Sequence, residues 1–201
     1  MTDGLIKPAS PEFAKLFRTF DRSAFRLELL QSYAGSGEDA ALEAFRNGEP
    51  YYRHPGKHGW LSNIDRAQQV GASMSRVHVV VEPLSEYMRY ECTWAYAPNV
   101  AAGEDVRIIS VPEGQTWPAS LGAAHDFWLF DDDRLYDMSY SGDEGEFHGV
   151  ALNNDPEAVA QARRWRDAAW DLAEPWSQWI EQRPELLALL PREARTGGDN
   201  R

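Results

Sequence analysis

Cysteine is almost absent from this chain of 201 residues, since Cys92 is the only one. An intrachain disulfide is therefore excluded, and so are zinc sites that need several cysteines. Cys92 falls in a predicted helix rich in aromatic residues, where we expect it to be a small buried apolar side chain.

Basic residues are also scarce, because 20 Lys and Arg stand against 32 Asp and Glu, for a net charge of -12. Phosphate backbones are bound by clustered Lys and Arg, so we expect no direct contact with nucleic acid. A cationic partner is compatible with this charge. One interpretation left open is that the acidic surface mimics nucleic acid toward a basic DNA-binding protein.

Long apolar runs and catalytic fingerprints are missing too. The first ten residues, MTDGLIKPAS, lack the apolar core of a signal peptide, and no stretch is long enough to span a bilayer. We therefore expect a cytoplasmic protein with no membrane partner. No serine nucleophile elbow, phosphate loop or dinucleotide-binding motif occurs, so no cofactor is predicted.

Aromatic residues, in contrast, are abundant and include eight Trp. They are expected to fill a core or to line a pocket. The length suits one domain with a sizeable core. We predict a single globular domain over residues 1–191 and a disordered polar tail over residues 192–201.

Three strand signals follow one another between His125 and Asn154. Residues 127–130 are apolar on both faces, and residues 135–140 and 147–152 alternate. Turn residues separate them at 131–133 and 141–145. The pattern predicts an antiparallel meander at the centre of a sheet.

A second group of elements predicts a parallel pair of strands. Residues 76–82 alternate as a strand, Ser85 can cap a helix that runs to about Tyr96, and residues 106–111 form another strand. Strand, helix and strand in this order suggest a βαβ unit. The fold class is therefore α/β with a mixed sheet, and α+β stays open as the alternative.

Helices are predicted on both sides of these strands. Helical spacing and capping residues predict N-terminal helices over residues 11–20, 22–33, 38–46 and 62–74. Asp155-Pro156-Glu157 opens a long C-terminal helix, and a short one follows near residues 179–190. Residues 48–60 contain two Pro and three Gly without periodicity, so we expect a loop there.

The stretch EPLSEYMRYE carries the candidate ligand site. A helix that begins just after a strand is where α/β proteins collect anions. We predict that Arg89 holds a small anion, although it could equally be paired with an acidic neighbour for structural support. The other predicted members of this cleft are Glu82, Ser85, Tyr87, Trp128, Trp60 and His125.

An acid/base site is the alternative. His125 would act as general acid or base, oriented by Asp126 or Glu91, with the loop from His54 to Trp60 as a lid. A lone histidine is more often a structural hydrogen-bonding residue. These three residues are the catalytic candidates only if the protein is an enzyme.

Metal binding is not predicted. His54 and His58 have a spacing that suits zinc on a helix, but Pro55, Gly56 and Gly59 argue against a helix there. Two exposed loop histidines are the simpler interpretation. The acidic run at residues 131–133 is interpreted as a solvated turn, because it lacks the spacing of a calcium loop.

Five segments carry a resemblance to a known family: residues 20–28, 82–91, 99–105, 126–131 and 165–170. They resemble an uncharacterised actinobacterial family that is catalogued as a domain of unknown function, over roughly residues 12–175. Members of that family are often encoded beside helix-turn-helix regulators, which implies a regulatory role or such a regulator as partner. The loop at residues 50–60 departs from the family pattern.

The order of elements is also similar to one half of the phospholipase D superfamily, which carries the motif His-x-Lys-x-x-x-x-Asp. His125 and Asp132 stand at the matching spacing, but Phe127 replaces the lysine that would hold phosphate. This resemblance implies a fold with ligand binding rather than phosphodiester chemistry.

We therefore expect a non-catalytic, cytoplasmic, regulatory protein that binds a small anionic ligand or a helix-turn-helix regulator. Whether it forms a homodimer stays open. The alternative is a small enzyme of specialised metabolism that uses His125 as general acid/base in an aromatic-lined cleft.

Overall fold

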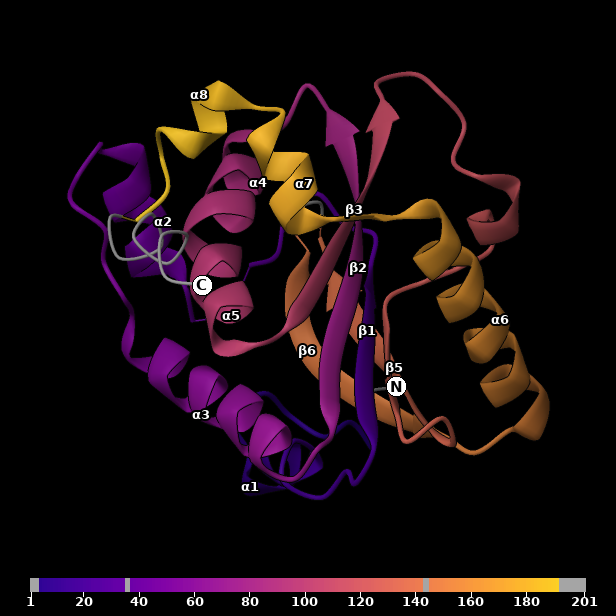
Figure 1. Cartoon of the computed structure of the whole chain (residues 1–201). Helices are drawn as coiled ribbons and strands as arrows, with labels where there is room; N and C mark the ends of the chain where they lie inside the picture. Colours follow the sequence, from indigo (N-terminus) through magenta and orange to yellow (C-terminus); the bar gives the residue numbers. More distant parts are fainter. Residues whose placement is uncertain (1–3, 35–36, 143–144, 192–201) are drawn as a thin grey trace.

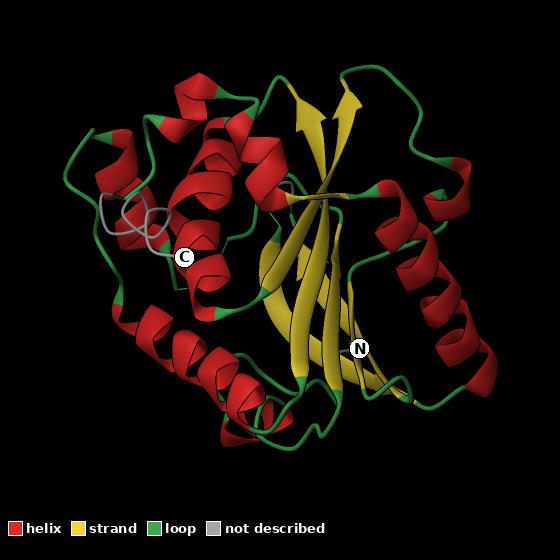
Figure 2. Ribbon diagram, viewed as in Figure 1, coloured by secondary structure: helices red, strands yellow, loops and turns green. Residues whose placement is uncertain are grey.

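A seven-stranded mixed sheet with helices on both faces forms the protein (Figures 1 and 2). The computed structural model describes residues 4–34, 37–142 and 145–191. The strand order is β6-β5-β4-β1-β2-β3-β7. The strands are β1 Ser23–Glu28, β2 Ser73–Glu82, β3 Asp105–Pro112, β4 Phe127–Phe130, β5 Arg134–Ser141, β6 Glu146–Asn153 and β7 Glu174–Pro175.

Short helices make up most of the helical layer, and two are longer. The α-helices are α1 Pro11–Leu16, α2 Asp39–Arg46, α3 Pro55–Gln69, α4 Glu86–Tyr90, α5 Tyr96–Ala102, α6 Pro156–Leu172, α7 Trp176–Glu181 and α8 Pro184–Leu187. A π-helical segment, η1 Glu91–Ala95, joins α4 to α5, and a 3-10 turn, η2 Ala119–Leu121, precedes β4.

The α/β class, the single domain, the βαβ unit and the meander are confirmed. Strands β1, β2 and β3 are parallel, and the helix from α4 to α5 connects β2 to β3. Strands β4, β5 and β6 pair antiparallel in sequence, as predicted. The meander occupies one side of the sheet, so the central strand is β1, which pairs with β2 on one side and β4 on the other.

One face of the sheet packs on α6. Alternate residues of β1 and β2 point to it, among them Phe25, Leu27, Val77 and Val79, and with α6 they form an apolar cluster. Asp155 caps the helix by accepting from the backbone N–H of Glu157, and Pro156 occupies the first turn, as predicted.

The opposite face lies under the helices α1 to α5 (Figure 1). The residues of β1 and β2 that point this way include Arg26, Glu28, Arg76 and His78, and the last three are almost fully buried. This face therefore combines a helical cover with charged groups.

The helix predicted at residues 22–33 is wrong, because the segment forms β1. Phe25, Leu29 and Leu30 fit a helical spacing, but Phe25 and Leu27 also fit a period of two. Arg26 and Glu28, between them, look like an exposed polar face. In the structure the opposite face is covered as well, and the two charges pair there.

Several boundaries also differ from the prediction. Helix α3 begins at Pro55, since proline is well suited to a first helical turn, so the loop predicted at 48–60 ends six residues early. α3 stops at Gln69, and Ser73 and Met74 belong to β2. α1 ends at Leu16, and Pro184 starts a separate helix, α8, after α7.

The tail predicted at 192–201 lies outside the described residues. Among the described residues, no helix combines the length and apolar character that crossing a bilayer requires.

Candidate functional site

A cavity of about 310 Å³ lies between the helical layer and the charged face of the sheet. This volume is at the lower end of the range for small-molecule sites, ~300–1,000 Å³. Side chains from β1, β2, β4, β5, α1, α3 and η1 line it. Its aromatic wall comprises Phe13, Phe17, Tyr33, Trp60, Tyr87, Trp128, Tyr140 and Phe147.

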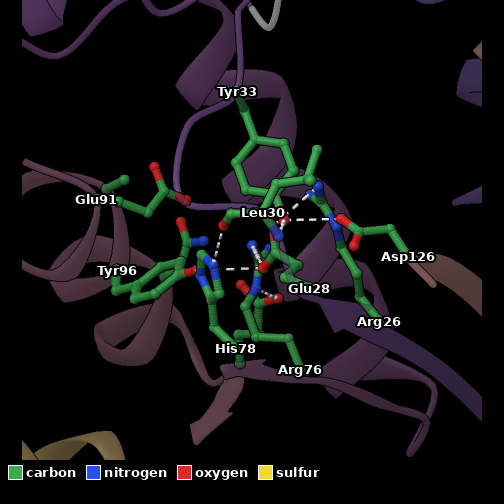
Figure 3. Close-up of polar contacts among 12 residues, drawn as sticks. Arg26, Glu28, Leu30, Tyr33, Arg76, His78, Glu91, Tyr96 and Asp126 are labelled. Atoms are coloured by element: carbon green, nitrogen blue, oxygen red, sulfur yellow. Dashed lines mark hydrogen bonds and ion pairs between the residues drawn. The ribbon is translucent and has the colours of Figure 1, made fainter. Parts of the chain in front are cut away.

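Two arginines and a glutamate form part of the cavity lining. Figure 3 shows the polar contacts among them. Glu28 Oε1 lies 2.8 Å from Arg26 Nη2, and Glu28 Oε2 lies 2.8 Å from Arg76 Nη1. Arg76 Nε also donates to Glu104 Oε1 at 2.8 Å. Burial opposes ionisation of Glu28, but Arg26 and Arg76 together lower its pKa to about 2. Glu28 is therefore a fixed anion.

The register of the parallel strands places these groups together. Arg26 of β1 is the partner of Arg76 of β2, and Glu28 is the partner of His78. Each guanidinium also lies over aromatic rings: that of Arg26 is 5.4 Å from the Tyr33 ring centre and 5.6 Å from that of Trp128. The stacking and the ion pairs hold both arginines in one orientation.

His78 is completely buried behind this cluster. Its Nε2 lies 2.8 Å from the carbonyl oxygen of Leu30, and its Nδ1 lies 2.6 Å from the hydroxyl of Tyr96, which is 3.1 Å from Glu28 Oε2. Burial lowers the pKa of His78, although Glu28 opposes the shift. Since a carbonyl oxygen can only accept, the imidazole donates from Nε2 to Leu30.

Glu91 enters the cavity from the π-helical segment. Pro98 lies in α5 and has no N–H for the carbonyl four residues earlier, and a π-helical stretch just before it shifts the hydrogen-bond pattern. The carbonyl of Cys92 accepts from Trp176 Nε1, and that of Ala95 accepts from Lys57 Nζ. Segments of this kind are frequent at functional sites.

The Glu91 carboxyl group is protonated at neutral pH. Burial and the nearby charges of Glu38 and Glu28 raise its pKa to about 8. The Tyr87 hydroxyl donates to Glu91 Oε2 at 3.2 Å. Glu91 is thus the one acid of the cavity lining that has a pKa near neutrality among the described residues.

A second acid with a raised pKa, Asp126, lies next to the cavity. Its Oδ2 accepts from the Tyr33 hydroxyl at 2.7 Å and its Oδ1 accepts from the Leu29 N–H at 2.9 Å. Burial raises its pKa to about 6, against the effect of the Tyr33 hydrogen bond and of Arg26. Tyr140, which lines the cavity, also donates to Asp126 at 3.4 Å.

Lys57 and Glu38 complete the polar lining. Lys57 Nζ donates to Asn99 Oδ1 at 3.2 Å and lies 3.8 Å from Glu38 Oε1, which is 3.2 Å from His54 Nε2. His54 is thus buried beside the cavity, and the expectation of two exposed loop histidines is wrong for it, while His58 is exposed on α3. Within the described ranges, no three His, Cys, Asp or Glu side chains are grouped so as to hold a metal ion.

Four of the residues predicted from the sequence meet at this cavity. Tyr87, Glu91, Trp60 and Trp128 all line it, although they come from four different elements. Their assignment to ligand binding or catalysis stays a prediction. The structure shows that they line the same cavity.

The other members of the predicted cleft lie elsewhere. Glu82 pairs with Arg183 at 2.5 Å and accepts from Ser110 at 2.9 Å. Ser85 caps α4 by accepting from the Met88 N–H, as predicted, and Arg89 is exposed on the outer side of that helix. A single cleft with these residues is therefore wrong, because successive residues of a helix point in different directions.

His125 lies on the α6 side of the sheet. Its Nε2 is 2.8 Å from Asp137 Oδ1, and its ring contacts that of Trp165. Orientation by Asp126 or Glu91 is wrong, since the carboxyl group of Asp126 points to the other face. The segment from His54 to Trp60 is the start of α3 rather than a loop that could act as a lid.

The two residues at phospholipase D spacing also have structural partners. Asp132 pairs with Arg166 of α6, and His125 pairs with Asp137. They lie at opposite ends of β4, outside the cavity lining.

Sequence reasoning missed Arg26, Glu28, Arg76 and His78. The available signal was the placement of charged or polar residues at alternate positions of strands that are otherwise strongly apolar. Such residues are costly to bury unless they pair, so several of them on neighbouring strands indicate a built polar site.

Comparison with known proteins identifies the family. A model described as "Domain of unknown function (DUF6879)" matches residues 11–181. The chain belongs to this family. The resemblance noted over residues 12–175 is thereby confirmed as far as a family of unknown function, and no curated protein matches the sequence.

One solved structure with a similar arrangement is Nuc from Salmonella typhimurium, described as a phospholipase D family member. It has 11% sequence identity and a TM-score of 0.45, and the match covers 83% of this chain and 93% of that one.

Proposed function

We propose that this protein binds a small organic molecule in the cavity between the sheet and helices α1 to α5, without chemical conversion. The observation that carries this proposal is a cavity of about 310 Å³ with eight aromatic side chains around a buried network of ion pairs among Arg26, Glu28, Arg76 and Glu104. Ligand sites combine an apolar wall with a few fixed polar groups in this way. Arg89, to which the sequence assigned an anion, lies outside the cavity, so the charge of the ligand has to be argued from the cavity itself.

The polar side chains around the cavity are held firmly by ion pairs and hydrogen bonds, which favours binding over catalysis. Glu28 has a pKa of about 2 and forms ion pairs with two arginines, so it is a weak base. His78 is hydrogen-bonded on both ring nitrogens and is out of reach of the cavity. Groups held this firmly lose little conformational entropy when a ligand binds, which strengthens affinity.

A fragment screen with a cavity-filling variant tests this function. Aromatic fragments are screened by ligand-observed NMR against the wild type, Met138→Trp and Val70→Trp. Met138 lines the cavity, whereas Val70 is 57% exposed at the end of α3, so both variants gain a Trp but only the first fills the cavity. We expect fragments that bind the wild type and Val70→Trp but not Met138→Trp. Absence of hits at millimolar concentration, or hits that Met138→Trp leaves unchanged, would contradict the proposal.

An acid/base enzyme is the second candidate, and the pKa of about 8 at Glu91 favours it. General acids and bases work best when their pKa lies near the operating pH. If the protein is such an enzyme, Glu91 is the general acid or base, the role that the sequence assigned to His125. Turnover of a compound that binds in the cavity, abolished in Glu91→Gln and unaffected in His125→Ala, would establish it.

A regulatory role with a helix-turn-helix protein as partner rests on the family resemblance alone and is a proposal, as is a cytoplasmic location. Co-purification with a helix-turn-helix regulator, taken from beside the gene where one is encoded there, tests the partner. A complex that forms with the wild type and changes stability when the cavity is filled by Met138→Trp would link binding to regulation. A regulator that elutes separately would exclude it.

A further inference from the structure

The buried layer around the cavity contains more acids than cations. The cations are Arg26, Arg76 and Lys57. The acids are Glu28, Glu38, Glu91, Glu104 and Asp126. Ion pairs account for three of these acids, since Glu28 pairs with Arg26 and Arg76, Glu104 pairs with Arg76, and Glu38 pairs with Lys57.

Two acids are left without a cation in the described part of the chain. Asp126 accepts hydrogen bonds from two tyrosine hydroxyls and a backbone N–H, and it is not part of the cavity lining. Glu91 accepts a hydrogen bond from the Tyr87 hydroxyl at Oε2. It does line the cavity, although only 6% of its surface is exposed. When Glu91 is ionised, its counter-charge therefore has to come from the cavity.

The two arginines are poorly suited to hold an anion. Both already pair with carboxylates at 2.8 Å and lie over aromatic rings, and of their buried nitrogens only Arg26 Nε has no hydrogen-bond partner among the described residues. An incoming anion would add a negative charge to a layer that already has an excess of acids. An incoming cation would reduce that excess.

The aromatic wall favours the same sign of charge. It already carries two cations, since Arg26 lies over Tyr33 and Trp128, and Arg76 lies 5.7 Å from the ring centre of Trp60. Ring faces attract organic cations, and a carboxylate among aromatic rings is the usual lining of an ammonium site.

We propose that the cavity binds an organic monocation, an amine or quaternary ammonium with an apolar body, and that Glu91 is its counter-ion. The apolar body would contact the aromatic wall, and the cationic group would lie at Glu91. This inference rests on the proposed function and adds the chemical class of the ligand.

Binding would then be coupled to ionisation of Glu91. Its carboxyl group carries a proton at neutral pH and has to release it to pair with a cation, so affinity rises as the pH rises through about 8. The ionisable groups around it are Tyr87, Tyr96 and Cys92 on its own helix, Glu38 and Tyr33 before α2, Lys57 of α3, and Glu28 and Arg76 of the sheet. Cys92 and these tyrosines have raised pKa values because they are buried, and the pKa values of Glu28 and Glu38 are lowered, so Glu91 dominates this pH range.

Three probes that share a benzyl group differ in charge. Benzyltrimethylammonium is permanently cationic, benzyl alcohol is neutral and phenylacetate is anionic, so none of the three changes its own charge near pH 8. Affinity is measured by calorimetry on the full chain with the wild type, Glu91→Gln and Glu113→Gln. Glutamine is isosteric with the protonated glutamate and should leave the fold intact. Glu113 is exposed and away from the cavity, so that variant controls for loss of one negative charge.

We expect benzyltrimethylammonium to bind about tenfold or more tightly than the other two probes, since a buried charge pair contributes at least that factor. Binding should release protons at neutral pH, tighten up to about pH 8, and weaken about tenfold in Glu91→Gln but not in Glu113→Gln.

Other outcomes overturn the proposal in distinguishable ways. Binding of benzyl alcohol or phenylacetate in preference to the cation would remove the inference while the cavity remains a ligand site. Equal binding of the cation to the wild type and Glu91→Gln would remove Glu91 as its counter-ion. Absence of binding by all three probes would count against the proposed function as well.

Discussion

The two faces of the central strands are both buried, but they are stabilised in different ways. Toward α6, residues such as Phe25, Leu27, Val77 and Val79 contact apolar side chains, so stability follows the area removed from water. Toward the cavity, Arg26, Glu28, Arg76 and His78 depend on each partner being in place. The first face can tolerate a change of shape, whereas the second cannot tolerate the loss of one charge.

The comparison relates the cavity of the candidate site to the face of the sheet on which it lies. Apolar side chains on the α6 face interdigitate with the helix. On the other face the charged groups hold one another through directional bonds, and the helical layer there is built from short pieces interrupted by a π-helical segment. Space remains between them, and it is bordered by groups of fixed geometry.

The largest effect should come from removing the cation that two acids share. Arg76→Met leaves Glu104 without a cationic partner and Glu28 with Arg26 alone, so we expect a loss of about 3–5 kcal/mol in the free energy of unfolding. Urea denaturation measures it. Arg164→Met, on the exposed side of α6, is the control and should change stability by less than about 0.5 kcal/mol. A loss below about 1 kcal/mol for Arg76→Met would show that the network contributes little.

The next effect depends on pH and on Glu91. Burial and the charges of Glu38 and Glu28 raise its pKa from 4.5 to about 8, so the folded state holds this proton more tightly than the unfolded state. Wild-type stability therefore contains a contribution that is full at acid pH and is lost as the pH rises to about 8. Glu91→Gln lacks this loss, so its stability relative to the wild type should rise by on the order of 3 kcal/mol between about pH 5 and about pH 9.

Denaturation of both proteins at the two pH values tests this difference. Glu113→Gln, with an exposed carboxylate removed, should run parallel to the wild type. If the stability of Glu91→Gln also ran parallel to that of the wild type, the Glu91 carboxyl group of the wild type would have an ordinary pKa in the folded protein.

A smaller effect is expected where the N-terminal segment closes the cavity. Ile6 exchanges backbone hydrogen bonds with Val150, and Pro8, Ala9 and Phe13 of the following segment line the cavity. Gly149 has a φ of 139°, and a Cβ there would lie 2.3 Å from the Ile6 carbonyl oxygen.

Gly149→Ala should therefore cost about 2 kcal/mol and weaken ligand binding, because the segment has to move. Gly114→Ala is the matched control: its φ is also positive, 77°, but no atom lies within 4 Å of the added Cβ. Thermal denaturation of the two variants separates the clash from the cost of the backbone conformation. Equal losses would mean that the contact with Ile6 does not matter.

The smallest effect belongs to the half-exposed pair on the α6 side, His125 and Asp137. The hydrogen bond to Asp137 raises the pKa of His125 against the effect of burial. The pair therefore stabilises the fold at acid pH, and the contribution is lost as the pH rises through the raised pKa. His125→Ala should cost about 1 kcal/mol or less at mildly acid pH and less than that at alkaline pH, where only the ring contact with Trp165 is lost, as measured by urea denaturation. Asp137→Asn should reproduce this dependence, and a large loss at alkaline pH would contradict it.

The predictable parts of the fold were those whose signals are local. Alternating valines identified β2, turn residues divided the meander, and Asp155-Pro156-Glu157 identified the start of α6. β1 was missed because Arg26 and Glu28 interrupt its apolar pattern, and Arg76, the partner of Glu28, lies 48 residues away in sequence. A pairing of that range is set by strand register, which no single segment specifies.

The site was half predictable for the same reason. Tyr87, Glu91, Trp60 and Trp128 were found because aromatic and acidic residues near strand ends attract notice. His125 was assigned to the same side as Asp126, although neighbours on an extended chain point to opposite faces. The π-helical segment that carries Glu91 had one signal, Pro98 inside a helical stretch, and this signal does not by itself specify the direction of a side chain.

The central claim is that Glu91 lacks a counter-ion until a cation enters the cavity. The most direct test is an NMR titration of the Glu91 side-chain carboxyl carbon, assigned by comparison with Glu91→Gln. Without ligand, the carboxyl group should titrate near 8, and saturating benzyltrimethylammonium should lower that pKa by a unit or more, to about 7 or below. A titration near the ordinary value for glutamate in the free protein, or one that the cation leaves unchanged, would contradict the account.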